Sequence, residues 1–200
     1  MIGERHDVRH ATEADRGALA ATLARAFYDD PVMTWFFPDD ERRLERNRRF
    51  FAMRLRQLLP HGETYTVDGA LGGALWAAPD RWRVGRLEEA RMSIALLSAV
   101  WRRAGPILRG VEMIEAAHPR DPHHYLAVLG TEPEAQGRGV GSALMRPMLD
   151  ACDSDDVPAY LESSKERNID FYARHGFRVT GEVRLPRGPT VWSMWRDPRA

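Results

Sequence analysis

A glycine-rich turn between an apolar run and an amphipathic segment restricts the fold of this 200-residue chain more than any other feature. The run from Tyr125 to Leu129 predicts a buried central strand, and glycines then stand at alternate positions, at Gly137, Gly139 and Gly141. A helix is expected next, with an apolar face formed by Val140, Leu144, Met145, Met148, Leu149 and Cys152. This order gathers unpaired backbone N–H groups and the positive end of a helix dipole in one concavity, which favours phosphate binding.

Two common phosphate-binding glycine motifs do not fit this turn. The dinucleotide fingerprint needs a third glycine at the position of Ser142, and the nucleoside-triphosphate loop needs Gly-Lys-Ser/Thr, whereas the chain's only lysine is Lys165. What remains is a Gln-x-x-Gly-x-Gly pattern from Gln136 to Gly141, with a positive charge on Arg138. Taken alone, this pattern also fits a turn that merely joins a strand to a helix, because glycine is common wherever a positive φ is needed.

A second pattern follows downstream of the turn. Residues 158–164 predict a strand parallel to the first, because the intervening helix provides a right-handed crossover. Residues 168–177 then read Asn-Ile-Asp-Phe-Tyr-Ala-Arg-His-Gly-Phe. Together with the glycine turn, this Asn…Phe-Tyr…Gly-Phe string resembles the GNAT superfamily of acyl-CoA-dependent N-acetyltransferases.

Two further segments narrow the resemblance. Residues 115–125 and 187–195 are similar to the corresponding segments of the puromycin N-acetyltransferase-like branch. That branch also places the asparagine four residues before the tyrosine, as Asn168 precedes Tyr172 here, where many superfamily members have it at the position of Lys165. The first half of the chain matches only in layout.

The resemblance implies one GNAT domain over residues 1–200, with an α/β fold whose mixed central sheet has about six to seven strands and helices on both faces. Residues 1–117 would mainly form the acceptor pocket, and residues 118–200 the acetyl-CoA-binding core. The hydrophobic pattern of the first half predicts a strand over 8–10, helices over 13–28, 41–59, 85–103 and 106–117, and a β-hairpin of 63–67 with 71–77. Residues 31–38 are interpreted as a loop with an apolar cluster.

The resemblance also implies acetyl-CoA as co-substrate. Backbone N–H groups of the glycine turn would hold the diphosphate, and the pantetheine arm would pair with a strand edge like an added strand. A bulge at Gly130 would splay the two parallel strands, and a backbone N–H at Leu129 or Gly130 would stabilise the oxyanion. The residues implicated in cofactor binding are Val128, Leu129, Gly130, Gln136, Gly137, Arg138, Gly139, Val140, Gly141, Ser142, Asn168 and Tyr172.

Two catalytic residues are expected, Tyr172 and Glu162. The resemblance places the Tyr172 hydroxyl near the CoA sulfur, where a phenol can protonate the departing thiolate, although the ring would equally pack against the turn. Glu162 shares a strand face with Tyr160 where the parallel strands should part, and some family members that acetylate α-amino groups have Leu-Glu there. The alternative for Glu162 is a strand carboxylate that backbone N–H groups satisfy. Other candidates, acting through water, are Glu112, Glu115 and His118.

Neither a metal site nor an acceptor pocket is well defined by the sequence. Prolines interrupt the segment that carries His118, His123 and His124, so these residues are expected at loop and strand-edge positions rather than around a metal, with His124 able to hydrogen-bond in the acceptor cleft. The aromatic and apolar residues of the first half are expected mostly in the core, with one or two as pocket walls. The candidate walls are Trp35, Phe36, Phe37, Trp76 and residues 92–101.

Composition limits the partners. Twenty-nine basic residues balance 29 acidic ones, which gives no electrostatic case for nucleic acid or an anionic membrane. The single cysteine, Cys152, rules out an internal disulfide and fits a reducing compartment. No signal peptide is recognised, and the apolar stretch 92–101 is far shorter than the ~20 residues that span a bilayer. A cytoplasmic monomer or homodimer is therefore expected.

The leading interpretation is an enzyme that moves an acetyl group from acetyl-CoA to a primary amine of a small molecule by direct attack, without a metal. One alternative is a protein or peptide N-acetyltransferase. Another is a non-catalytic acyl-CoA sensor, against which the intact Tyr172 argues. The sequence does not identify the acceptor amine, because its pocket is built from the segments least tied to any motif.

Overall fold

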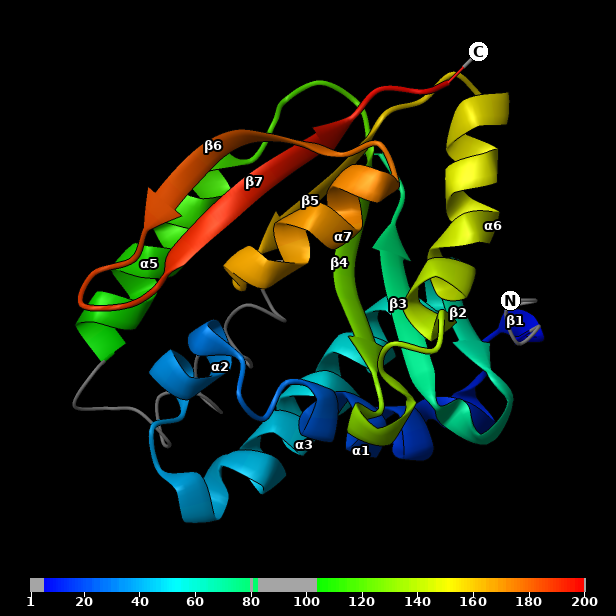
Figure 1. Ribbon diagram of the computed structural model, residues 1–200. Coiled ribbons are helices and arrows are strands. Elements are labelled where there is room, and N and C mark those ends of the chain that lie inside the picture. The colour runs from blue at the N-terminus through cyan, green and yellow to red at the C-terminus, as the bar shows by residue number, and fades with distance from the viewer. Residues whose placement is uncertain (1–5, 80, 83–103, 200) are drawn as a thin grey trace.

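The structure is a computed structural model that describes residues 6–79, 81–82 and 104–199 (Figure 1). Its strands form one seven-stranded sheet in the order β1-β2-β3-β4-β5-β7-β6, which confirms the expected mixed α/β fold. Only β4 and β5 are parallel; the other neighbouring pairs in this sheet are antiparallel. The strands are β1 Val8–His10, β2 Thr64–Val67, β3 Gly72–Ala77, β4 His124–Thr131, β5 Ala159–Ser163, β6 Arg178–Arg184 and β7 Thr190–Arg196.

Helices cover both faces of the sheet (Figure 1). The first face carries α1 Arg16–Ala26, α2 Pro31–Phe36, α3 Asp40–Leu58 and α5 Ala104–Ala117. The second face carries α6 Val140–Ser154 and α7 Ile169–Arg174. Short 3₁₀ turns occupy residues 13–15, 59–61, 68–70, 133–135 and 166–168. The helix expected over 85–103 lies outside the described residues, and no helix within them is long and apolar enough to cross a membrane.

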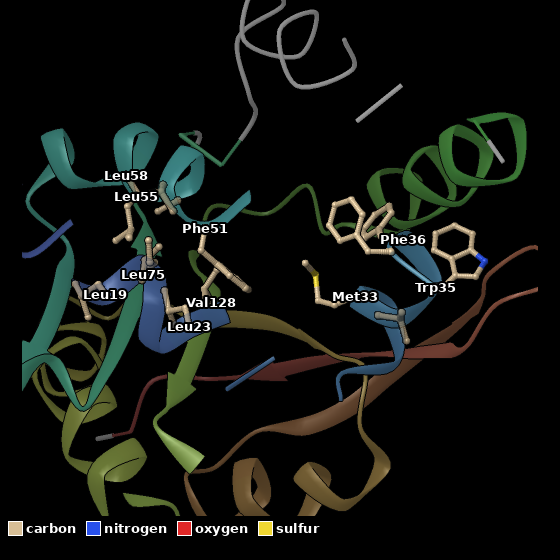
Figure 2. Close-up of a cluster of buried hydrophobic side chains, with 14 of the residues drawn as sticks. Leu19, Leu23, Met33, Trp35, Phe36, Phe51, Leu55, Leu58, Leu75 and Val128 are labelled. Atoms are coloured by element: carbon tan, nitrogen blue, oxygen red, sulfur yellow. The ribbon is translucent and has the colours of Figure 1, made fainter. Parts of the chain in front are cut away.

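Each face of the sheet has its own hydrophobic core. On the first face, side chains of α1 and α3 lie against β3 and β4, as Figure 2 shows for Leu19, Leu23, Phe51, Leu55, Leu75 and Val128. On the second face, the six apolar positions expected along α6 are all buried, with exposed fractions between 0 and 7%. Each such side chain stabilises the fold by roughly 1.5–3 kcal/mol, and together these cores hold the rigid sheet that positions the site.

The expected loop over residues 31–38 is wrong, because residues 31–36 form the helix α2. The carboxylate of Asp30 accepts hydrogen bonds from the backbone N–H groups of Val32 at 2.9 Å and Met33 at 3.1 Å. Pro31 occupies the first helical position, where its missing N–H costs nothing. An Asp-Pro pair is thus a helix start signal. The helix was not predicted because the apolar run that follows the pair is too short to show a helical period.

The bulge expected at Gly130 lies instead at Ala127. Leu75 pairs with Val128 and Trp76 with Leu126, so β4 has one extra residue at Ala127. As a result Leu126 packs in the core of the α6 face, whereas Val128 packs in the core of the α1 face. Glycine is required at position 130 for another reason. A Cβ there would lie 2.7 Å from Cδ2 of Leu23, so the absence of a side chain allows α1 to approach β4.

Candidate active site

The parallel strands β4 and β5 part halfway along their length (Figure 1). They pair only from His124–Leu126 to Ala159–Leu161. Beyond that point β5 continues to pair with β7 as far as Ser163, while β4 continues to Thr131 beside β3. Within the described residues, the β5-facing edge of β4 from residue 127 onward therefore has no strand partner, and an extended ligand can reach its backbone N–H and C=O groups.

A cavity of about 400 Å³ lies at this opening, between the end of α1, the glycine turn and α7. Ten of the twelve residues expected to bind the cofactor line it, which is all of them except Val128 and Arg138. Val128 is buried in the α1-face core and Arg138 is exposed. The two halves of the sequence pattern, the glycine turn and the Asn…Phe-Tyr string, thus meet in one cavity.

The glycine turn has the backbone that its sequence predicts. Gly137 and Gly139 have positive φ angles of 77° and 86°, and Gly139 is the N-cap of α6. The first backbone hydrogen bond of this helix runs from the Ala143 N–H to the Gly139 carbonyl. The N–H groups of Val140, Gly141 and Ser142 precede that bond and so have no acceptor within the helix. These N–H groups and the helix dipole give the cavity wall a positive potential.

Several cavity residues were not expected from the sequence. Basic side chains of Lys165, Arg167 and Arg174 add positive charge to the wall, and Asp30 lies opposite them. The Ser164 hydroxyl donates to Asp30, and the Lys165 ammonium contacts Asp29 at 2.5 Å. The α1–α2 loop is therefore tied to the end of β5. Lys165 and Arg167 could have been found from their place beside the Asn168 string, whereas Asp30 is far from any motif.

Tyr172 lines the cavity and is 8% exposed. Burial raises the pKa of its hydroxyl, and the negative charge of Asp30 raises it further. The phenol consequently keeps its proton at neutral pH and can serve as a proton donor. Its ring packs edge-on against Phe171 and Phe177, which shows the packing role, while the acid role stays a prediction.

Glu162 lies at the point where the strands part, directly after the last paired residue of β5. The hydrogen-bonding partners of its carboxylate are side chains rather than backbone N–H groups. The Tyr125 hydroxyl donates to Oε2 at 2.5 Å, and Nδ1 of His118 lies 3.3 Å from Oε1. Burial raises the pKa of Tyr125 well above its usual value, followed by the charge of Glu162, so Tyr125 remains a donor. The guanidinium of Arg54 on α3 also lies close enough to interact with both groups.

The histidines depart from expectation. His118 and His123 follow α5 and precede β4, as expected, but they are buried at 7% and 2% exposure and stack with aromatic rings. His124 does not join them: alternation along β4 turns it to the other face, where its Nδ1 lies 3.9 Å from Glu63. Among the described residues no group of three or more His, Cys, Asp or Glu side chains is arranged to hold a metal ion.

Cys152 is a packing residue. Its side chain is fully buried in the α6-face core. Burial raises the pKa of its thiol to about 12, so the nucleophilic thiolate is not populated at neutral pH.

Comparison with known proteins defines the class. The family model of the acetyltransferase (GNAT) family matches residues 24–177, and the chain belongs to that family. An uncharacterised N-acetyltransferase of Schizosaccharomyces pombe is 28% identical over 186 residues, which cover 84% of this chain and 72% of that protein.

Solved structures share the fold. A crystal structure described as histone acetyltransferase HPA2 and related acetyltransferase from Corynebacterium glutamicum has a TM-score of 0.74 and 26% identity, over 98% of this chain and 97% of that one. The PaiA N-acetyltransferase of Thermoplasma acidophilum, solved in complex with coenzyme A, has a TM-score of 0.59 and 10% identity, over 96% and 99% of the two chains. The resemblance to the puromycin N-acetyltransferase-like branch stays a prediction.

Proposed function

We propose that this protein transfers an acetyl group from acetyl-CoA to a primary amine of a small molecule. The observation that carries the proposal is the parting of β4 and β5 above the glycine-turn cavity, with an acid and a base candidate on opposite faces of the sheet. Tyr172 belongs to the α6-face core, whereas Glu162 contacts Tyr125, which packs against the α1-face core. A thioester held in the gap would lie between the two groups.

The cofactor would enter from the cavity side. Backbone N–H groups from Gln136 to Ser142 would hold the diphosphate, with Asn168 beside them, and the basic residues Lys165, Arg167 and Arg174 favour this polyanionic ligand. The pantetheine arm would pair with the free edge of β4, and a backbone N–H at Leu129 or Gly130 would stabilise the oxyanion by about 3 kcal/mol. The coenzyme A complex of a protein with the same fold supports this assignment.

The reaction is direct attack. The amine nitrogen bonds to the thioester carbonyl carbon and gives its proton to Glu162, the carbon–sulfur bond breaks, and the CoA thiolate takes the proton of Tyr172. The position of Tyr172 in the cavity lining supports its role, because its hydroxyl is the proton donor of the Asn…Phe-Tyr string. The chain's described residues supply both proton transfers without a metal.

A small acceptor is proposed on the puromycin-like sequence pattern. On the cofactor side, Asp30 accepts from Ser164, and Asp29 contacts Lys165 at 2.5 Å and Arg167 at 3.3 Å, so the α1–α2 loop is tied to the segment that follows β5. The puromycin-like pattern makes puromycin the first amine to test. We assign the acceptor pocket mainly to residues 1–117 and the cofactor core to residues 118–200 of one cytoplasmic domain.

Two measurements test the proposal. Calorimetry should detect acetyl-CoA binding, and a panel of primary amines that includes puromycin should show acetyl-CoA-dependent thiol release with at least one member. Failure to bind acetyl-CoA would overturn the proposal. Turnover with a peptide library but with no small amine would establish the peptide acetyltransferase instead. Tight binding without turnover of either class would establish an acyl-CoA sensor.

A further inference from the structure

A chain of three contacts connects Glu162 to the loop that precedes β4. Oε1 of Glu162 lies 3.3 Å from Nδ1 of His118, and Nε2 of His118 lies 3.0 Å from Nε2 of His123. Nδ1 of His123 lies 2.6 Å from the carbonyl oxygen of Asp121. Since both imidazoles are buried, each of these contacts needs a proton to be a hydrogen bond rather than a repulsion between lone pairs.

The contact with the Asp121 carbonyl determines which atom donates in each of the other contacts. A backbone carbonyl only accepts, so Nδ1 of His123 donates to Asp121. Burial lowers the pKa of His123, which keeps this ring neutral and leaves its Nε2 without a proton. Nε2 of His118 must then donate to it. Both nitrogens that carry a proton in the neutral rings are thereby assigned, and Nδ1 of His118 faces Glu162 with a lone pair.

A proton count shows that one more proton is needed. Three contacts require three protons, but two neutral imidazoles provide only two. The other carboxylate oxygen of Glu162 is occupied by the Tyr125 hydroxyl, whose single proton is used there. The third proton must lie between Oε1 of Glu162 and Nδ1 of His118, on one atom or the other.

We propose that Glu162, His118 and His123 hold one exchangeable proton in common, and that this triad, rather than an isolated carboxylate, is the base of the reaction. His118 and His123 are positioning residues, because they act through Glu162. The catalytic part of this inference rests on the proposed function, whereas the proton count does not. Glu162 can accept the proton of the amine only after the shared proton has left, and accepting it returns the triad to the neutral form.

The groups around the triad fit this behaviour. Arg54 of α3 interacts electrostatically with Tyr125 and Glu162, so its positive charge balances the triad after the proton has left. The Tyr160 hydroxyl donates to Ser193 and also lies close enough to Glu162 to interact with it. Burial raises the pKa of Tyr160, as it does that of Tyr125, and the charge of Glu162 raises both further, so both phenols stay neutral.

Aromatic rings pack against both imidazoles and hold them in place. Trp82 stacks on His118 with ring centroids 3.6 Å apart, and Trp195 meets His123 edge-on at 5.5 Å. His124, on the opposite face, is the other titratable group that interacts with His123, and its charge is disfavoured by burial. The shared proton is therefore held between neutral neighbours and one arginine.

Nitrogen-15 spectra of the histidine rings test the triad without any need for turnover. At neutral pH, the signals lost in His123→Asn should show a protonated Nδ1 and a bare Nε2, and those lost in His118→Asn a protonated Nε2. As the pH rises, both rings should report one common transition. In Glu162→Gln the amide N–H replaces the shared proton, so the ring of His118 should remain neutral with Nε2 protonated throughout that transition.

The matched control is His124→Asn, which alters a neighbouring half-buried histidine outside the Glu162–His118–His123 contacts and should leave the common transition unchanged. The triad is refuted by a protonated Nε2 on His123, or by a His118 titration that is the same in Glu162→Gln as in the wild type. Glu162→Gln is nearly isosteric and keeps the Tyr125 contact, so it is expected to fold even where His118→Asn does not.

Kinetics separate this inference from the proposed function. If the triad is the base, the acid limb of kcat/KM should coincide with the common transition in the spectra, and Glu162→Gln should lower kcat by about 10²–10⁴-fold. If the spectra show the common transition but Glu162→Gln has an unchanged kcat, the shared proton is supported and its role in catalysis is refuted. An acid limb that does not move in His118→Asn would likewise show that Glu162 acts alone.

Discussion

The indole ring of Trp35 occupies the space that a side chain on Gly188 would need. A Cβ built on Gly188 would lie 2.7 Å from Nε1 and 2.9 Å from Cδ1 of Trp35, and a Cβ on Gly110 of α5 would lie 2.7 Å from Cη2. The indole ring of Trp35, a residue of α2, is thus held between α5 and the β6–β7 turn. Two glycines distant in the sequence, Gly110 and Gly188, therefore allow α2 to lie against both α5 and the β6–β7 turn.

Gly188→Ala should therefore destabilise the protein by about 1–3 kcal/mol, because backbone and indole must move apart to admit the methyl group. Urea unfolding at constant m-value would measure the change. Gly17→Ala on α1 is the control, since a Cβ there meets nothing within 4 Å, and its stability should stay the same or rise slightly. Equal stabilities for Gly188→Ala and the wild type would show that the indole of Trp35 can move aside without a cost in stability.

Gly139→Ala should weaken acetyl-CoA binding. Its φ of 86° lies in the left-handed region, so alanine costs about 1–2 kcal/mol there and tilts the N–H groups at the start of α6. Gly62→Ala is a close match, because Gly62 has a φ of 78° and open space around it but lies outside the cavity lining. Calorimetry should find a weaker acetyl-CoA affinity for Gly139→Ala alone, although both variants lose stability. A similar loss of affinity in both would assign the effect to general destabilisation.

Tyr172→Phe should lower kcat by about 10²–10⁴-fold while the dissociation constant of acetyl-CoA changes little. The phenol keeps its proton in the buried site, and phenylalanine preserves the ring packing against Phe171 and Phe177 but removes the donor. Steady-state kinetics with calorimetry on the same preparation would check both parts. A normal kcat would remove the acid role and leave Tyr172 as a packing residue.

Acid should weaken the attachment of β7 to α6. Arg196 is 2% exposed and donates to Asp153 at 2.7 Å and to the His175 carbonyl at 3.0 Å. The hydrogen bond from Arg196 lowers the pKa of Asp153 below its unfolded value, so its stabilisation is present above about pH 4 and is lost as the pH falls through the folded pKa. Between neutral pH and pH 3, the free energy of unfolding should therefore fall less in Asp153→Asn than in the wild type. Parallel pH curves for the two proteins would contradict this.

Local patterns in the sequence predicted much of the cofactor half. The apolar positions of α6, the glycine turn before it and the succession of strands and helices along the chain follow from local patterns that need no distant partner. Ten of the twelve expected cofactor residues line one cavity for the same reason, since they lie in two short segments joined by a single crossover.

Features that depend on contacts between distant segments were less accessible to such reasoning. The helix α2 was missed because six residues are too few for a periodicity, and its Asp-Pro start signal was the only indication. The bulge at Ala127 depends on how β3 aligns with β4, which the β4 sequence alone does not show. His118 and His123 were separated from Glu162 by about forty residues, and no motif connects them.

The sequence thus indicated the family through the resemblance of two motifs. It also predicted the sheet-and-helix layout and the turn that faces the cavity, because φ preferences and hydrophobic periodicity act within a few residues of chain. Only the tertiary structure decided which polar groups meet Glu162, how α2 is held by Gly110 and Gly188, and where β4 and β5 part. Those features are contacts between segments distant in the chain, and they arise from burial and from the need to pair every buried polar group.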